Sequence, residues 1–153
     1  MSIHKCDVLF FGSPGGHLDQ LIDIIQVIDT DNCALVVDKP VEIHPENCKV
    51  GVFVISEGRG LGRLKNVFEV GILFFALRPR VLISTGASPA VYFFLFSKFL
   101  NCKSIFVESL ARVSSLSKTG KLVKPLATKF FVQWETLASV TNTEFRGRCK
   151  VKG

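Results

Sequence analysis

The stretch Gly12-Ser13-Pro14-Gly15-Gly16-His17-Leu18 decides the fold of this chain, because it follows the apolar run 8–11 directly. A buried strand that ends in a glycine-rich turn before a helix is typical of open α/β sheets. Ligands gather at such turns because the N–H groups of a helix start favour negative charge. The spacing differs from the dinucleotide fingerprint G-x-G-x-x-G and from a P-loop, which needs Lys followed by Ser or Thr after its last glycine. His17 stands there instead and brings a titratable imidazole to the turn.

Short apolar runs alternate with longer helix-compatible segments along the whole chain. The runs are rich in Val, Ile, Leu and Phe and lack clean alternation, as expected for parallel strands covered on both faces. We therefore predict an α/β fold, with one Rossmann-like domain over residues 1–153 and an open parallel sheet that has helices on both faces. The predicted strands are 7–11, 34–37, 50–55, 81–84, 104–107 and 130–133, and the predicted helices are 18–28, 61–77, 89–100 and 118–128.

The composition indicates a folded chain with an apolar and unevenly charged surface. Of its 153 residues 48% are hydrophobic, 14 are Phe, and the mean hydropathy is +0.36. Residues 1–58 carry three Lys against nine Asp and Glu, whereas residues 59–153 carry sixteen Lys and Arg against four Glu. This asymmetry favours an anionic partner over a solvated basic surface without a ligand. Nucleic acid is not expected, because no aromatic and basic strand or recognition helix accompanies the charge.

Cysteine and histidine usage argues against a metal or disulfide framework. The five cysteines are widely spaced and form no Cys-x-x-Cys pair, which favours reduced thiols in a reducing compartment. The three histidines are scattered, so we expect no metal site and no cofactor, and we assign His4 and His44 no role.

Two apolar segments bear on membrane contact. Residues 70–77 lie between basic residues at 63, 65, 78 and 80, and residues 90–96 precede Lys98. At about 1.5 Å per residue, the first spans only about 12 Å and cannot cross a bilayer. Each segment is either a buried crossover helix or a helix that lies on a membrane surface with its basic side chains at the headgroups.

Three loops follow predicted strands and are expected to meet at the carboxyl edge of the sheet. They are the glycine–His turn, the segment Ser84-Thr85-Gly86-Ala87-Ser88-Pro89, and the segment that begins at Glu108 and reaches Arg112. Together they would bring an imidazole, a carboxylate, a guanidinium and several N–H donors to one crevice. The alternatives are a structural His17 that is hydrogen-bonded to a backbone carbonyl, an ion pair between Glu108 and Arg112, and an ordinary turn at residues 84–87.

These loops resemble the asparagine-linked glycosylation protein 14 family, which includes bacterial capsule and exopolysaccharide counterparts. Two further segments carry the resemblance, Thr119-Gly120-Lys121-Leu122-Val123 and Phe131-Val132-Gln133-Trp134-Glu135, and all the motifs come in family order. The resemblance implies the amino-terminal half of a GT-B glycosyltransferase, made as a separate chain. It also implies a partner subunit that carries the nucleotide-sugar-binding half. The chain is similar, too, to the amino-terminal domain of the peptidoglycan N-acetylglucosaminyltransferase, which opens with a Gly-Gly-His turn.

The resemblance also implies roles for particular residues. Ser13, Gly15 and Gly16 would line the pyrophosphate of the acceptor, and His17 would orient the acceptor or deprotonate its hydroxyl. Glu108 is the second candidate base. The further acceptor or phosphate ligands would be Ser84, Thr85, Gly86 and Arg112, and the cleft or the partner seam would be shaped by Gln133, Trp134 and Glu135.

The function implied is that of a membrane-recruiting, acceptor-binding subunit. A sugar (GlcNAc, galactose or similar) would pass from a UDP-sugar to a lipid-pyrophosphate-linked acceptor at the cytoplasmic face of a membrane, with the bacterial plasma membrane favoured over the endoplasmic reticulum. The chain would be inactive alone. Eukaryotic members begin with a membrane anchor, whereas this chain begins within seven residues of its first strand, so we expect its basic and apolar helices to contact the membrane. Its short cationic end, 146–153, differs from the family's docking tail. The alternative is a non-catalytic scaffold that only activates its partner.

Overall fold

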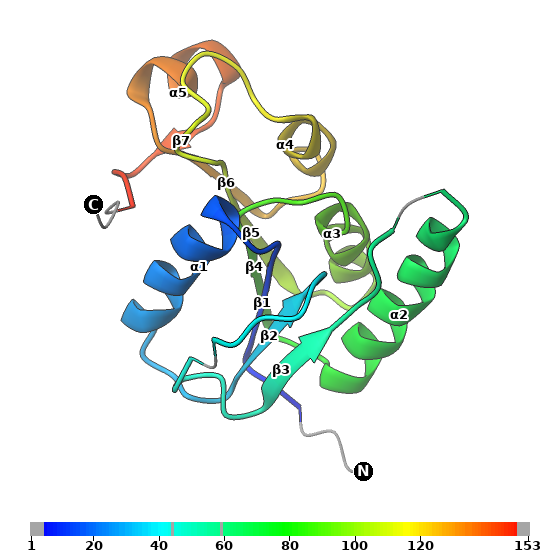
Figure 1. The fold of residues 1–153 in the computed structure, drawn as a ribbon. Helices are drawn as coiled ribbons and strands as arrows, with labels where there is room; N and C mark the ends of the chain where they lie inside the picture. Colours follow the sequence, from blue (N-terminus) through cyan, green and yellow to red (C-terminus); the bar gives the residue numbers. More distant parts are fainter. Residues whose placement is uncertain (1–4, 44, 59, 150–153) are drawn as a thin grey trace.

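The computed structural model describes residues 5–43, 45–58 and 60–149, and these form one parallel sheet with five helices (Figure 1). His4, His44 and the last four residues lie outside the described ranges. The strand order is β3-β2-β1-β4-β5-β6-β7. The strands are β1 (Val8–Gly12), β2 (Cys33–Val37), β3 (Gly51–Val54), β4 (Val81–Ser84), β5 (Lys103–Val107), β6 (Lys129–Val132) and β7 (Glu144–Phe145). The predicted Rossmann-like sheet is confirmed.

The helices agree with the predictions except near the carboxyl end. They are α1 (Gly16–Val27), α2 (Gly62–Leu77), α3 (Ala90–Phe99), α4 (Lys118–Val123) and α5 (Glu135–Thr141). The prediction that the fourth helix reaches residue 128 was wrong. It ends at Val123 because Pro125 has no N–H for the next helical bond, and a turn closed by Leu126 N–H on the Val123 carbonyl (2.8 Å) follows. The sequence analysis missed α5 and β7.

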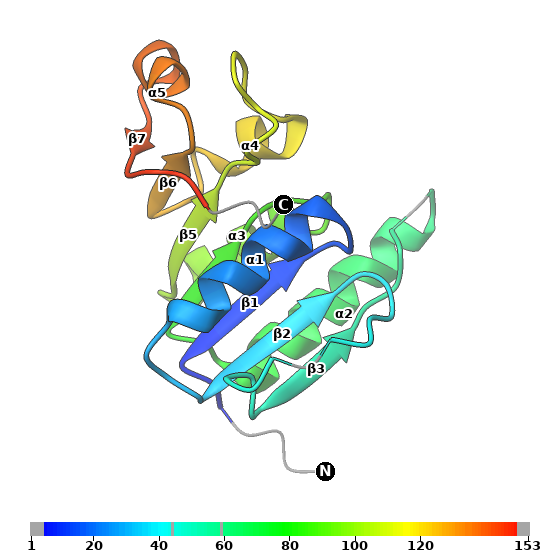
Figure 2. The ribbon, with the colours of Figure 1, turned by 60° about the vertical axis from the view of Figure 1, so that its left-hand side comes forward.

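The two faces of the sheet are covered unequally (Figure 2). One face packs against α2 to α5, where Phe11 stacks on Phe93 with ring centroids 4.7 Å apart. The other face packs against α1 alone, whose Leu21 and Ile25 cover the β1 and β2 side. Ile105, Val107 and Phe131 on the neighbouring strands remain partly exposed there. Parallel sheets are normally buried on both faces, so this face is incompletely covered.

The point where the chain order reverses lies between β1 and β4. In the parallel register Phe11 is beside Ser84 and Gly12 is beside Val37, so β1, β2 and β4 end at the same level. Ligands of open α/β sheets bind outside the carboxyl ends of the strands at such a reversal. The glycine–His turn and the loop after β4 flank this point.

Candidate functional site

A cavity of about 340 Å³ lies at this reversal, and we call it the switch-point cavity. Four segments that follow β1, β2, β3 and β4 line it. Its residues are Ser13, Pro14, His17, Asp38, Lys39, Glu57, Gly58, Ala87, Ser88 and Pro89. Two of the predicted site residues, Ser13 and His17, are therefore brought together here.

The imidazole of His17 is fixed between the glycine–His turn and the loop that follows β4. Helix α1 begins with Gly15 as its N-cap, at φ 106°, which is a conformation that favours glycine. The hydroxyl of Thr85 donates a hydrogen bond to the His17 carbonyl (2.6 Å). Gly86 backs the ring so closely that a Cβ at this position would lie 2.8 Å from His17 Cε1. Nδ1 is buried without a hydrogen-bond partner in the described part of the chain, so the ring retains an unused polar atom.

The loop after β4 supports the glycine–His turn. Its residues Ser84, Thr85 and Gly86 do not line the switch-point cavity. All three residues are buried, and Ser84 Oγ accepts a hydrogen bond from Gly86 N–H (3.3 Å). Their placement does not support the predicted direct contact with an acceptor. Gly15 and Gly16, in contrast, are exposed at the start of α1, where first-turn N–H groups have no intrahelical partner.

Two carboxylates that the sequence analysis missed line the switch-point cavity. Asp38 follows β2 and accepts a hydrogen bond from the Ser13 hydroxyl (2.6 Å). Glu57 follows β3 and pairs with Lys39 (2.7 Å). Applying the strand-end argument to these two strands would have found both. Carboxylates accept hydrogen bonds from hydroxyl groups, so this wall suits a polyhydroxylated ligand, and the imidazole beside it can accept a proton.

Glu108 is fully buried and its carboxylate bonds to its own chain. Oε1 accepts from Ser109 N–H (2.9 Å), and Oε2 accepts from the N–H (2.9 Å) and the hydroxyl (3.0 Å) of Ser117. Ser117 also caps α4 by accepting from Gly120 N–H (2.9 Å). Glu108 does not line the switch-point cavity, and this placement does not support its predicted role as a base. Arg112 is exposed and forms no ion pair with Glu108.

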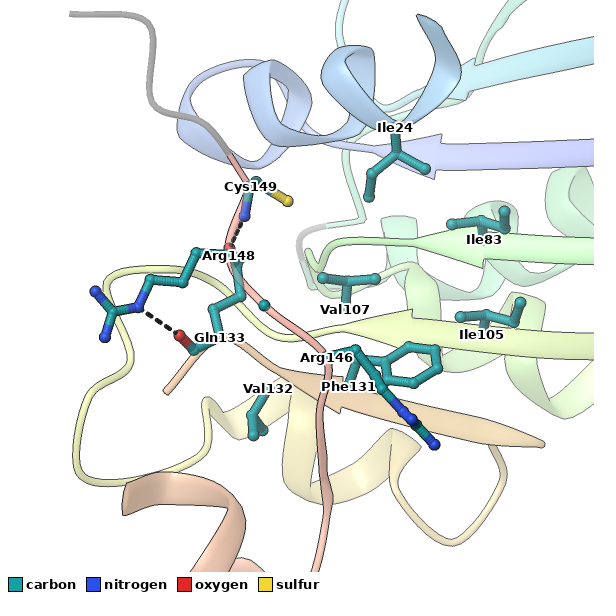
Figure 3. Close-up of a pocket in the computed structure, with 11 residues that line it drawn as sticks. Ile24, Ile83, Ile105, Val107, Phe131, Val132, Gln133, Arg146, Arg148 and Cys149 are labelled. Carbon is teal, nitrogen blue, oxygen red and sulfur yellow. Dashed lines mark hydrogen bonds between the residues drawn. The ribbon is translucent and has the colours of Figure 1, made fainter. Parts of the chain in front are cut away.

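Gln133 holds the end of the described chain across the incompletely covered face of the sheet (Figure 3), and Trp134 contacts the same segment. Gln133 Nε2 donates to Gln20 Oε1 (2.8 Å) and to the Glu108 carbonyl (3.0 Å), and its Oε1 accepts from Cys149 N–H (2.8 Å). The Arg148 guanidinium lies 3.9 Å from the Trp134 ring centroid.

A second cavity, of about 380 Å³, lies between this end segment and the sheet, and we call it the sheet-face cavity. Ile83, Ile105, Val107 and Phe131 form its apolar floor (Figure 3). Gln133 lines it, whereas Glu135 is exposed at the start of α5. Gln20, which joins α1 to Gln133, was not predicted.

Helix α2 has one buried and one exposed apolar side. Val70, Phe74 and Leu77 are buried, whereas a second set recurs at intervals of three and four residues and faces solvent. This apolar stripe consists of Leu61 (89% exposed), Leu64, Phe68 (71%), Ile72 (67%) and Phe75, and α3 adds Leu95 and Phe99. Within the described ranges, no helix is both long and apolar enough to cross a membrane.

The buried cysteines are chemically quiet. Burial is the largest cause that raises the pKa of Cys6 and Cys48 to about 12 and that of Cys33 and Cys102 to about 11. These thiols are therefore protonated at neutral pH and are poor nucleophiles. Among the described residues, no group of three or more His, Cys, Asp or Glu side chains is arranged to hold a metal ion.

Comparison with solved structures agrees with this architecture. The chain superposes on MurG from Acinetobacter baumannii, a GT-B protein, with a TM-score of 0.70 and 12% identity, over 96% of this chain and 47% of that one. It superposes on the UDP-GlcNAc 2-epimerase from Methanocaldococcus jannaschii with a TM-score of 0.58 and 16% identity, over 85% and 40% of the two chains. At these identities the likeness shows the fold alone, and the fold is that of about half of a GT-B protein.

Sequence comparison identifies the family. The UDP-N-acetylglucosamine transferase subunit ALG14 of Candida albicans is 27% identical over 88% of this chain and 74% of its own length. The corresponding subunit of Schizosaccharomyces pombe is 42% identical over 40% of this chain and 31% of its own length. Residues 64–149 match the family profile described as "Oligosaccharide biosynthesis protein Alg14 like", which is more than half of the chain. The chain therefore belongs to the Alg14-like family of oligosaccharide biosynthesis proteins.

Proposed function

We propose that this chain is the acceptor-binding subunit of a two-chain glycosyltransferase that transfers a sugar from a UDP-sugar to a lipid-pyrophosphate-linked acceptor. The observation that carries the proposal is the switch-point cavity, where His17, Asp38 and Glu57 line the same space at the reversal of strand order. The names of the relatives, which are subunits of a UDP-N-acetylglucosamine transferase, support this class of reaction.

The residues of the cavity suit the acceptor side of a transfer reaction. The acceptor hydroxyl attacks the anomeric carbon of the donor sugar, a new C–O bond forms, and the bond to UDP breaks, with inversion at that carbon. The imidazole of His17 takes the hydroxyl proton, and UDP departs with the bonding electrons. Asp38, oriented by Ser13, and Glu57 accept hydrogen bonds from the sugar. The exposed N–H groups at Gly15 and Gly16 bind the phosphate that is attached to the acceptor sugar.

A separate subunit would supply the donor-binding half. The superposition on 47% of MurG supports this, because a GT-B enzyme binds its two substrates between two such halves. We place the seam with this subunit at the sheet-face cavity and the adjoining residues Gln133, Trp134 and Glu135. A parallel sheet needs cover on both faces, and among the described residues only the short segment 146–149 crosses the apolar floor.

Peripheral attachment to the cytoplasmic face of a membrane would follow from the apolar stripe. Arg63 and Lys65 lie at one end of α2, and Arg78 and Arg80 at the other, and all four are exposed. Basic groups beside exposed Leu, Ile and Phe side chains suit a bilayer that contains anionic lipids.

The proposal is tested with the purified chain and its partner subunit. We expect UDP-sugar-dependent elongation of a lipid-linked acceptor by the two chains together and none by this chain alone. His17→Ala should lower kcat by about 10² or more while the complex stays assembled, because a general base contributes about that much. A His17→Ala complex that assembles and turns over normally would instead support the alternative of a non-catalytic scaffold. Absence of sugar transfer by the wild-type complex would refute both the acceptor-binding subunit and the scaffold of a glycosyltransferase.

A further inference from the structure

A third cavity, of about 250 Å³, adjoins the switch-point cavity and has no role in the mechanism above. The two cavities share Gly58, Ser88 and Pro89 in their walls. The third cavity lies where α2, α3 and α4 begin, since Arg63, Val91 and Lys118 from these helices line it. The two cavities are therefore adjacent.

The rim of this third cavity is cationic. Arg63 comes from the first turn of α2, and Lys118 and Thr119 come from the first turn of α4. Neither cation forms an ion pair within the described part of the chain, and no carboxylate lines the cavity. The buried Glu108 holds the start of α4, on which Lys118 lies, because it binds Ser117, the N-cap of this helix. Two such cations on one rim favour a phosphate group.

The wall of the third cavity contains an unsatisfied acceptor, which lies beside Gly58. Asn66 is fully buried, and its Nδ2 donates to the Ser56 carbonyl (2.7 Å), which fixes the amide orientation. Its Oδ1 has no hydrogen-bond partner in the described structure and lies beside Gly58. An unpaired buried acceptor costs about 1–3 kcal/mol. This cost is an independent sign that a hydrogen-bond donor of a ligand belongs in the third cavity beside Gly58.

Part of the lining of this cavity is apolar. Val91, Tyr92 and Leu122 line it, and Leu122 is 60% exposed on α4. Beyond Arg63, the exposed side chains Leu61 and Leu64 begin the apolar stripe of α2. A lipid chain that leaves the cavity would therefore pass directly onto the surface that we assign to the membrane.

We propose that the third cavity binds the phosphate nearest the lipid and the first part of the lipid chain of the acceptor, while the acceptor sugar occupies the switch-point cavity. The inference rests on the proposed function and deepens it. Arg63 and Lys118 bind the phosphate, and Leu122 and Val91 contact the chain. The cavity thus selects an acceptor that carries both groups over a free sugar phosphate.

Equilibrium binding of farnesyl pyrophosphate to the full chain tests this assignment without the partner. We expect Arg63→Gln and Lys118→Gln each to weaken binding about tenfold, as loss of one charge-assisted hydrogen bond implies. Leu122→Asn should weaken binding of farnesyl pyrophosphate and leave the weaker binding of inorganic pyrophosphate unchanged. The matched controls are Lys121→Gln on α4 and Lys103→Gln on β5, which are exposed and do not line the cavity.

Two further measurements separate this site from the proposed membrane surface and from the transferase proposal. In the two-chain complex, Lys118→Gln should raise the KM for the lipid-linked acceptor about tenfold and leave the KM for the UDP-sugar unchanged. Binding of the chain to anionic vesicles should be insensitive to Lys118→Gln. Equal farnesyl pyrophosphate binding by the variants and the wild type, or a parallel loss of vesicle binding, would overturn the assignment. Variant-sensitive binding without any transfer by the wild-type complex would overturn the transferase proposal and leave a phosphate–lipid site.

Discussion

The contact between Gly120 and Glu108 gives the most quantitative prediction. A Cβ at Gly120 would overlap Glu108 Oε2 and lie 3.0 Å from Ser117 Oγ. Glu108 is fully buried, so Gly120→Ala must displace its carboxylate and break the two hydrogen bonds that Oε2 accepts from Ser117. Hydrogen bonds to a charged group contribute about 1.5–3 kcal/mol each, so we expect Gly120→Ala to cost about 3–5 kcal/mol of unfolding free energy.

The effect of Gly120→Ala on the free energy of unfolding should change sign when Glu108 is already absent. In a Glu108→Ala background the overlap disappears, and Ala at position 120 should stabilise the chain by up to about 1 kcal/mol, because Ala is a better helix former than Gly. Urea unfolding followed by the fluorescence of the single tryptophan, Trp134, measures all four states of this double-mutant cycle. A neutral Gly120→Ala in the wild-type background, or additive costs in the double variant, would refute the reasoning.

Three further predictions concern the loops, the thiols and the apolar stripe. Gly86→Ala should lower kcat of the two-chain complex at least about tenfold by displacing His17. Gly51→Ala, which has a similar positive φ but only ordinary contacts with Phe53, should not. Equal effects on kcat would contradict the role of the contact between Gly86 and the His17 ring. The buried thiols have pKa values of about 11–12 in the folded chain, whereas unfolded thiols ionise near about 8.5, so the unfolded state releases protons first as pH rises. The melting temperature should therefore fall above about pH 9, and it should fall less steeply in a Cys6→Ala/Cys48→Ala variant. Identical slopes of melting temperature against pH would count against this linkage. Phe68→Glu/Ile72→Glu should weaken sedimentation with anionic vesicles more than tenfold, whereas Val140→Glu, at an equally exposed site on α5, should leave it unchanged; unchanged binding by the double variant would remove the stripe from the membrane contact.

The regular part of the fold was predictable because its strands are apolar on both faces. The runs at β1, β2 and β4 are five, five and four residues long and nearly all buried, so their pattern identifies them without tertiary information. Helix α5 gives no such signal, since Leu137 is its single buried residue and Thr, Ser and Val favour other conformations. The end of α4 was readable from Pro125.

The candidate site was predictable in part, for a different reason. Strand ends identify which side chains reach the carboxyl edge, and this argument located His17 and Ser13. It does not tell which way a carboxylate turns. Asp38 turns into the switch-point cavity, while Glu108 turns back onto Ser117 through a contact that depends on a glycine twelve positions later. Such a contact is set by packing and has no local sequence pattern.

The central position of β1 has a consequence for synthesis of the chain. This strand is made first, yet one of its two neighbours, β4, follows it by about 70 residues. At translation rates of about 5–20 residues per second, the apolar segment Val8–Gly12 waits about 4–15 s before it can complete its pairing. During this interval an uncovered hydrophobic strand edge is available to other nascent chains. Chaperones that cover this strand during synthesis should therefore raise the yield of folded protein.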